Sequence, residues 1–150
     1  MSLVQQISDD IKTAMKGGDK ARLETLRFVF AGLQAAEKEK GLKEAGAKLS
    51  DDEAIAVLQK EAKRRKESIE LFKQGKRDDL VRKEEADLAV IMAYLPKELS
   101  RGDIAAMVDA ARATGANDFS SIMRETMKQV KGRADGKLVG EIIKEKLGGA

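Results

Sequence analysis

The sequence predicts an all-α protein with two lobes, and three observations support this prediction. Apolar residues recur at spacings of three and four along most of the 150 residues, which is the period of an amphipathic helix. No segment has the composition of a β-strand, and short apolar runs such as residues 28–30 lie inside helical periods. The only proline, Pro96, disfavours helical geometry at Leu95. We therefore expect an N-terminal four-helix lobe over residues 1–95 and a small C-terminal three-helix lobe over residues 96–150.

Two helices are predicted before residue 41. The first ends at the glycine pair 17–18, and its apolar stripe consists of Val4, Ile7, Ile11 and Met15. Asp19 can cap the second helix, because a short carboxylate accepts hydrogen bonds from the free amides of a first turn. The stripe of the second helix consists of Leu23, Leu26, Phe30 and Leu33. Residues 41–48 lack a strong period and are expected to form a loop.

The third and fourth helices complete the first lobe. Ser50 and Glu53 have the spacing of a capping box at the start of the third helix, which runs to about Lys73. Its apolar stripe consists of Ile55, Leu58, Ala62, Ile69 and Phe72. Gly75 ends this helix. The fourth runs from about Arg77 to Tyr94, with its row of apolar residues at Leu80, Leu88, Ile91 and Leu95.

Three shorter helices are predicted beyond Pro96. The residues that can cap them are Ser100 with Asp103, then Asn117 or Asp118, and finally Asp135. Their apolar stripes contain Ile104, Met107, Val108 and Ala111, then Phe119, Ile122, Met123, Met127 and Val130, and last Leu138, Val139, Ile142, Ile143 and Leu147. About 50 residues are few for an independent core, so we expect this lobe to need support from the larger lobe or from a partner.

The composition excludes several classes of chemistry. The chain has no cysteine and no histidine, so thiolate catalysis, disulfides and the commonest general base and metal ligand are excluded. Phosphate-binding loops and nucleophile elbows are also absent. We therefore expect no metal, no cofactor and no catalytic activity of the isolated chain. No apolar run has the length of a signal peptide or a membrane span, and we expect a cytoplasmic protein that does not bind membranes.

Arg65 interrupts the apolar stripe of the third helix. Glu84, with Glu85 beside it, interrupts the row of the fourth helix in the same way. A charge on a buried face needs a partner, because removing it from water is costly. We predict that Arg65 bonds to Glu84 or Glu85 across the helix pair as a structural salt bridge. The alternative, a carboxylate–arginine catalytic site, lacks an accompanying nucleophile or metal-binding set.

Two basic clusters are candidates for phosphate contact, although the net charge of +3 does not itself require nucleic acid. Lys63 and Lys66 share one face of the third helix and could straddle a phosphate backbone; the alternative is a solvated face. The second cluster surrounds the turn before the last helix and consists of Lys128, Lys131, Arg133 and Lys137. Free amides beside these cations could hold phosphate, or the cations could simply neutralise a helix C-terminus.

The aromatic residues do not indicate a base-stacking surface. All four phenylalanines lie on or beside apolar stripes, and we expect them in the core: Phe28, Phe30, Phe72 and Phe119. A platform that stacks single-stranded bases on aromatic rings is therefore not expected. Any binding of RNA would have to depend on phosphates and shape.

Several short segments, in their order along the chain, resemble one protein family. They are residues 10–16, 25–27, 67–68, 79–80, 94–96 and 131–136. Together they resemble the GatB/YqeY family, which includes free-standing YqeY-like proteins and the tail domain of the GatB subunit of tRNA-dependent amidotransferases. One departure is the pair at residues 119–120, Phe-Ser in this chain, where the family usually has Met-Gly.

The resemblance implies a role beside tRNA. In the amidotransferase the tail lobe of GatB helps to hold tRNA, whereas the kinase and glutaminase chemistry lies in other domains and subunits. We therefore expect a non-catalytic accessory module whose partner is tRNA or a tRNA-charging or amidotransferase complex, and we expect no binding to DNA. One alternative is a protein–protein adaptor with an apolar patch from Met107, Met123 and Met127. Another, by family relation only, is a component of a glutamine-dependent carbon–nitrogen ligase.

Overall fold

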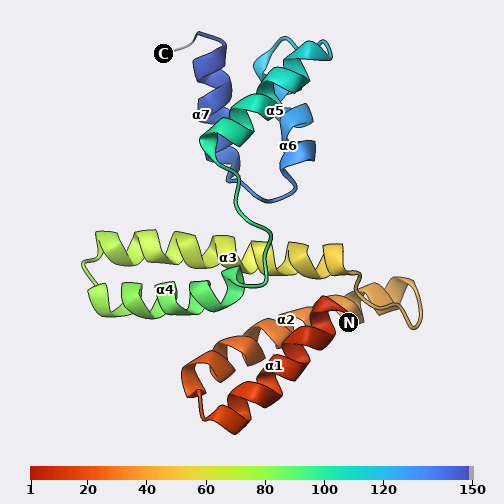
Figure 1. Ribbon diagram of the computed structural model, residues 1–150, viewed down its shortest axis with the longest axis vertical. Coiled ribbons are helices and arrows are strands. Elements are labelled where there is room, and N and C mark those ends of the chain that lie inside the picture. The colour runs from red at the N-terminus through yellow and green to blue at the C-terminus, as the bar shows by residue number, and fades with distance from the viewer. Residues whose placement is uncertain (149–150) are drawn as a thin grey trace. The chain divides into compact units, whose positions relative to one another are not determined.

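The computed structural model describes residues 1–148, in which it contains seven helices and no strand, so the predicted all-α class is confirmed. The first compact unit, Met1–Leu95, contains α1 (Leu3–Gly17), α2 (Lys20–Lys43), α3 (Asp51–Gln74) and α4 (Asp78–Met92). The second unit, Pro96–Ala150, contains α5 (Arg101–Ala113), α6 (Phe119–Val130) and α7 (Gly136–Lys146) (Figure 1). No described helix combines the length and the apolar character that spanning a membrane requires.

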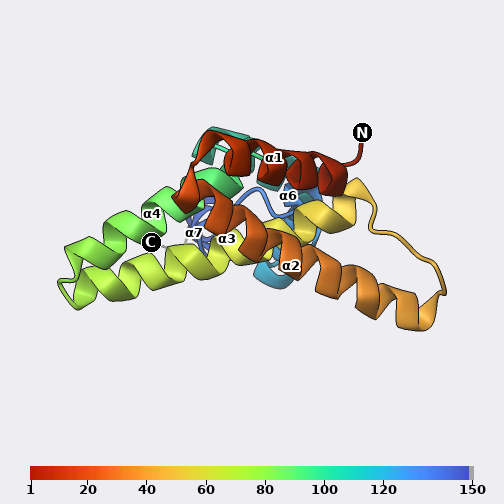
Figure 2. The ribbon, with the colours of Figure 1, turned by 90° about the horizontal axis from the view of Figure 1, so that it is seen from below.

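The N-terminal unit consists of two helical hairpins. Helices α1 and α2 form one, joined at Gly18, and α3 and α4 form the other, joined through Lys76 (Figure 1). Both joining residues have left-handed backbone, with φ of 70° and 56°, which turns the chain sharply between antiparallel helices. In Figure 2 the last turns of α2 project beyond the other helices. The fully buried side chains that hold the hairpins together include Ile7, Leu26, Leu33, Leu58 and Ile91.

The connection between α2 and α3 is held to α2 by ion pairs. Helix α2 extends to Lys43, a little beyond the predicted end near residue 40, and the chain then folds back. Glu37 accepts a hydrogen bond from the Leu49 amide at 3.2 Å and pairs with Lys48 at 3.2 Å. Lys40 Nζ lies 2.7 Å from Glu53 Oε1, and this bond is the main reason that the pKa of Glu53 falls to about 2. The predicted capping box of Ser50 and Glu53 is confirmed.

The C-terminal unit packs three helices around a separate apolar core. Its fully buried side chains include Ile104, Val108, Ile122, Val139 and Ile143. At Gly140 a Cβ atom would lie 3.6 Å from the Phe119 ring, so that ring covers the glycine where α6 and α7 meet. Ion pairs also join α5 to α7, with Arg101 2.9 Å from Glu145 and Lys146 2.9 Å from Asp109.

Four apolar residues expected in the core or on its apolar stripes are exposed. Phe28 is 53% exposed, Met15 54%, Leu147 41% and Phe119 37%, so the expectation that these side chains are buried is wrong. In α2 the buried face is formed by Leu26, Val29 and Leu33, and Phe28 lies on the other side of the helix. The apolar residues of α2 therefore occupy two faces, and a simple reading of its periodicity cannot distinguish the inner face from the outer one.

Two buried threonines have opposite environments. Thr25 on α2 donates a hydrogen bond from Oγ1 to Asp87 on α4 at 2.9 Å. Thr126 on α6 is fully buried, and its hydroxyl has no hydrogen-bond partner among the described residues. A buried polar group without a partner loses its hydration and gains nothing in return. The hydroxyl of Thr126 is therefore expected to destabilise the fold, whereas that of Thr25 is expected to stabilise it.

We expect the same substitution to act in opposite directions at these two sites. Thr126→Val should raise the free energy of unfolding by about 1 kcal/mol, because it removes an unsatisfied hydroxyl and keeps the branched shape. Thr25→Val should lower it by about 1–2 kcal/mol, because Asp87 loses a donor. Urea unfolding followed by circular dichroism measures both changes. A loss of stability in Thr126→Val would show that its hydroxyl has a partner in solution.

Candidate functional site

The predicted C-terminal basic cluster surrounds the turn between α6 and α7. Helix α6 ends at Val130. The chain reverses there because Lys131 and Gly132 both have left-handed backbone, with φ of 49° and 77°. A lysine in this conformation is unusual, since its Cβ is crowded where glycine has none. The turn thus places a basic side chain at the point of sharpest curvature.

Arg133 ties the segment before α5 to this turn. Its Nε donates a hydrogen bond to the carbonyl of Lys97 at 2.9 Å, and its own carbonyl accepts one from the Leu99 amide at 2.9 Å. Asp103 lies at the same end of the unit; hydrogen bonds from Ser100 lower the pKa of Asp103, and Arg133 and Lys97 add to this effect. Arg133 therefore has a structural task. Lys97 joins the basic cluster, which sequence spacing could not reveal because 35 residues separate Lys97 from Arg133.

The lysines of the cluster differ in how they are held. Lys128 lies 3.1 Å from Glu125, one turn before it on α6, and both side chains are largely exposed. Lys137 is exposed in the first turn of α7, where Asp135 accepts a hydrogen bond from its backbone amide at 3.1 Å. The sequence had suggested that free amides at the start of this helix could hold phosphate. Because the Asp135 side chain already caps the helix, we expect phosphate contact to come from lysine side chains instead.

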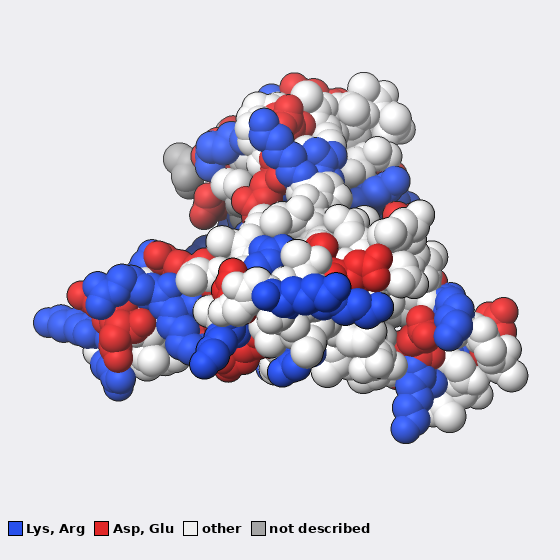
Figure 3. Space-filling model, turned by 60° about the horizontal axis from the view of Figure 1, so that its bottom comes forward, with Lys and Arg blue, Asp and Glu red and all other residues white. Residues whose placement is uncertain are grey.

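The other predicted basic pair, Lys63 and Lys66, lies exposed on α3 in the N-terminal unit. Figure 3 shows that acidic and basic side chains alternate over the face of the molecule that it draws. On α3 the neighbouring acidic residues Glu67 and Glu70 are exposed as well. Because acidic and basic side chains are mixed on α3, this helix is a weaker candidate for phosphate contact than the turn after α6.

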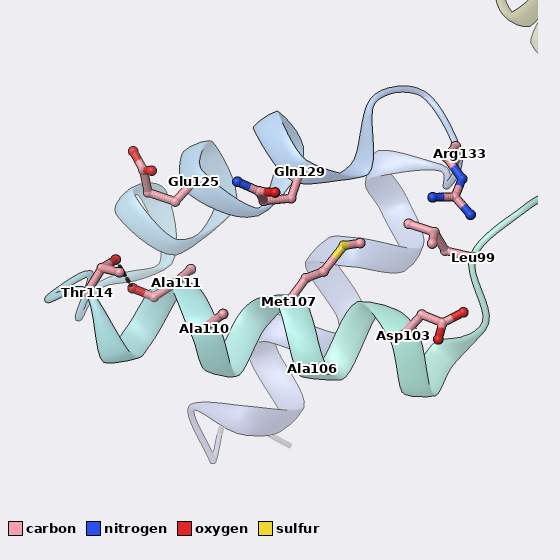
Figure 4. A pocket seen from close by; sticks show the side chains of 10 residues that line it. All are labelled: Leu99, Asp103, Ala106, Met107, Ala110, Ala111, Thr114, Glu125, Gln129 and Arg133. Carbon is pink, nitrogen blue, oxygen red and sulfur yellow. Dashed lines mark hydrogen bonds between the residues drawn. The ribbon is translucent and has the colours of Figure 1, made fainter. Parts of the chain in front are cut away.

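An open groove of about 560 Å³ runs between α5 and α6 in the C-terminal unit (Figure 4). Met107 lies on its floor beside the small side chains of Ala106 and Ala110, and Leu99 and Arg133 line one end. The two other methionines expected to form an apolar patch with Met107 are placed differently. A Cβ atom at Gly136 would lie 3.6 Å from the Met123 methyl and 3.8 Å from that of Met127, so both pack against the start of α7.

Arg65 is the centre of an ion network in the N-terminal unit. Its side chain is 13% exposed and contacts three carboxylates, Glu61 at 3.1 Å, Glu84 at 3.2 Å and Asp87 at 2.9 Å. The structure thus places Arg65 beside Glu84, one of its two predicted partners, whereas the other, Glu85, is exposed and does not take part in these contacts. Asp87, 22 residues from Arg65, was missed, although it lies three residues after Glu84 and therefore shares a face of α4 with it.

The same network extends to α2. The Arg65 guanidinium lies over the ring of Phe28, 5.3 Å from its centroid, in the geometry of a cation–π contact. Asp87, besides contacting Arg65, accepts the hydrogen bond from Thr25 described above. Helices α2, α3 and α4 therefore meet at one guanidinium. No cluster of acidic residues within the described part of the chain is arranged to hold a metal ion.

Tyr94, just after the end of α4, connects α4 to α1 and α2 through hydrogen bonds. Its hydroxyl donates a hydrogen bond to Asp10 on α1 and accepts one from Arg22 on α2 at 3.4 Å. Burial raises the pKa of the Tyr94 hydroxyl to about 12, and the bond to Asp10 adds to the shift. The sequence had placed Tyr94 only at the end of the fourth helix. Its contacts show that it closes the α1–α2 hairpin against the end of α4.

Comparisons with known proteins cover nearly the whole chain. The model of the family described as Yqey-like protein matches residues 4–147. The chain is 30% identical over 153 residues to altered inheritance of mitochondria protein 41, mitochondrial, from Pyrenophora tritici-repentis; the match covers 97% of this chain and 81% of that protein. It is 33% identical over 92 residues to a protein of the same name from Lachancea thermotolerans, covering 61% and 47% of the two chains. An uncharacterised protein of Schizosaccharomyces pombe is 30% identical over 87 residues, covering 58% and 67%.

We expect Arg65→Ala to lower the free energy of unfolding by about 3 kcal/mol, because it leaves three partly buried carboxylates without their shared cation. The matched control is Arg64→Ala. Arg64 is 70% exposed and lies 3.5 Å from Glu61, so its loss should change stability by less than about 0.5 kcal/mol. Thermal and urea unfolding of both variants measure the difference. Equal stability of the two variants would contradict a buried network at Arg65.

Tyr94 is the only tyrosine in the chain, so its ionisation can be followed without interference by ultraviolet absorbance. We expect a pKa of about 12 in the folded protein, and a lower value in Asp10→Asn, which removes the negative charge beside the hydroxyl. Because folding raises this pKa, the stabilising effect is complete below about pH 10 and is lost as the pH rises through 12. Titration near pH 10 while the protein stays folded would disprove the contact.

Proposed function

The chain belongs to the YqeY-like protein family, and from this premise we propose that it is a non-catalytic module that binds tRNA through its C-terminal unit. The supporting observation is the gathering of cationic side chains at one end of that unit, around the turn between α6 and α7. These side chains are Lys97, Lys128, Lys131, Arg133 and Lys137. The resemblance to the GatB tail supplies tRNA as the nucleic acid and a tRNA-charging or amidotransferase complex as its setting.

The geometry fits recognition of a phosphate backbone better than reading of bases. Lysines with long, mobile side chains can follow phosphates on a curved RNA surface, and each contact releases condensed counterions. Phe119 is the one aromatic residue of this unit; it covers Gly140 and its ring centroid lies 5.9 Å from Lys144 Nζ, so the unit has no row of rings on which bases could stack. RNA binding here should therefore depend on shape and salt and not on a particular base sequence.

We expect the full chain to bind tRNA more tightly than duplex DNA, with an affinity that falls as salt rises. The triple variant Lys128→Gln, Lys131→Gln, Lys137→Gln should weaken tRNA binding at least tenfold and reduce the salt dependence by about 2–3 ions. Arg133 is left intact because it holds the segment before α5. Fluorescence anisotropy at low and high salt measures both effects.

The matched control removes the same charge from the N-terminal unit. Lys12, Lys16 and Lys20 are exposed on or near α1, and their change to glutamine should leave tRNA affinity within about twofold. A double variant, Lys63→Gln with Lys66→Gln, tests the second basic cluster separately. Equal losses in the two triple variants would mean that tRNA responds only to net charge, and the proposed site would be withdrawn.

The groove between α5 and α6 favours a second candidate, a protein–protein adaptor. An open groove with a methionine floor suits an apolar side chain of a partner, because methionine adapts to irregular surfaces. Ala110→Asp would place a charge in the groove at an exposed position and leave the basic cluster unchanged. Loss of a protein complex from nuclease-treated extract in this variant, with tRNA affinity unchanged, would favour the adaptor. Loss of tRNA affinity would assign the groove to the RNA site.

A further inference from the structure

Helix α2 carries a second apolar stripe that the fold leaves exposed. Its members alternate at spacings of three and four over about 32 Å of helix and are Ala21, Glu24, Phe28, Ala31, Ala35, Lys38 and Leu42. All seven are exposed, and Leu42 is 84% exposed. Within the described residues Glu24 and Lys38 form no ion pair. We call these seven residues the outer stripe of α2.

Phe28 is a fixed part of this stripe. One side of its ring lies against the Arg65 guanidinium, which three carboxylates hold in place. The ring is therefore already ordered when its exposed side meets another surface. An ordered aromatic ring loses little conformational freedom on binding, which makes it an effective anchor for an interface.

The outer stripe is complementary to itself when two copies run antiparallel. Ala31 lies at its centre, seven residues after Glu24 and seven before Lys38. A two-fold axis at Ala31 therefore places each Glu24 opposite the Lys38 of the other copy. In the same register Phe28 lies level with position 34 of the other copy, between the small side chains of Ala31 and Ala35.

Leu42 lies level with position 20 of the other copy, one residue from Ala21, so each end of the stripe also places a large side chain next to a small one. A parallel arrangement would instead place Glu24 against Glu24, Lys38 against Lys38 and Phe28 against Phe28. Like charges at one level of a helix pair are unfavourable, and polar residues in such a seam select the orientation of the helices. The pattern of charge and size therefore favours the antiparallel pair.

We propose that a second copy of this chain covers the outer stripe, through an antiparallel α2–α2 contact with its two-fold axis at Ala31. The contact repeats the same surface on both copies, as two-fold symmetry requires. One helix pair rich in alanine buries less area than a standard stable interface, so the dimer forms weakly and at high protein concentration. This inference does not depend on RNA binding, because it concerns the other unit of the chain.

Sedimentation velocity over about 10 µM to 1 mM tests the contact with the full chain. We expect the wild type to shift from monomer towards dimer over this range. Ala31→Glu, which sets two carboxylates together at the axis, should weaken association at least tenfold. Ala56→Glu is the matched control, since it adds the same charge at an exposed alanine of α3 and should leave association unchanged. A wild type that remains monomeric at 1 mM overturns the proposal.

Charge exchange and cross-linking then distinguish the two orientations. Glu24→Lys alone and Lys38→Glu alone should each weaken the dimer, and the double variant should restore it, whereas a parallel pair would gain nothing from the exchange.

The chain has no cysteine, so single cysteines can be introduced cleanly. A mixture of Ala21→Cys and Leu42→Cys chains should form mixed disulfides on oxidation. Cross-linking of Leu42→Cys to itself, without the mixed product, would contradict the antiparallel contact.

Discussion

The N-terminal unit depends on one desolvated cation. Arg65 lies on a helix face that otherwise carries apolar residues, and three carboxylates from two helices surround it. A guanidinium can satisfy several carboxylates at once because its donors spread in a plane. Asp87 then links this group to Thr25, and the flat face of the guanidinium supports Phe28. Three helices therefore meet at one guanidinium, and its removal would leave three partly buried carboxylates without their shared cation.

Arg133 has a comparable role in the C-terminal unit, but it acts on backbone. Its side chain binds the carbonyl of Lys97, while its own carbonyl holds the Leu99 amide. The segment before α5 is thereby fixed beside the turn that follows α6. This arrangement brings Lys97 to the basic cluster, in which Arg133 has a structural role. Arg133 shapes the surface on which the lysines of the cluster lie.

Prediction from sequence succeeded where structure depends on near neighbours. The capping residues Asp19, Ser50, Ser100 and Asp135 were all identified, because each needs only an amide two or three residues away. Contacts between helices were found only in part. The position of Arg65 on an apolar stripe indicated that a carboxylate was needed, and Glu84 was identified, but the approach of Lys97 to Arg133 depends on tertiary packing that no local spacing encodes.

The error at Phe28 has the same origin and is informative about function. Periodicity identifies an apolar face but not the surface that covers it, and α2 has two such faces. One packs into the core through Leu26 and Leu33, while the other presents Phe28 outward, supported from behind by Arg65. A ring that served only to cover a guanidinium would not need a matched stripe extending to Leu42. The stripe continues from Phe28 to Leu42 at spacings of three and four, and this continuity along the exposed face of α2 is the observation that the proposed α2–α2 contact rests on.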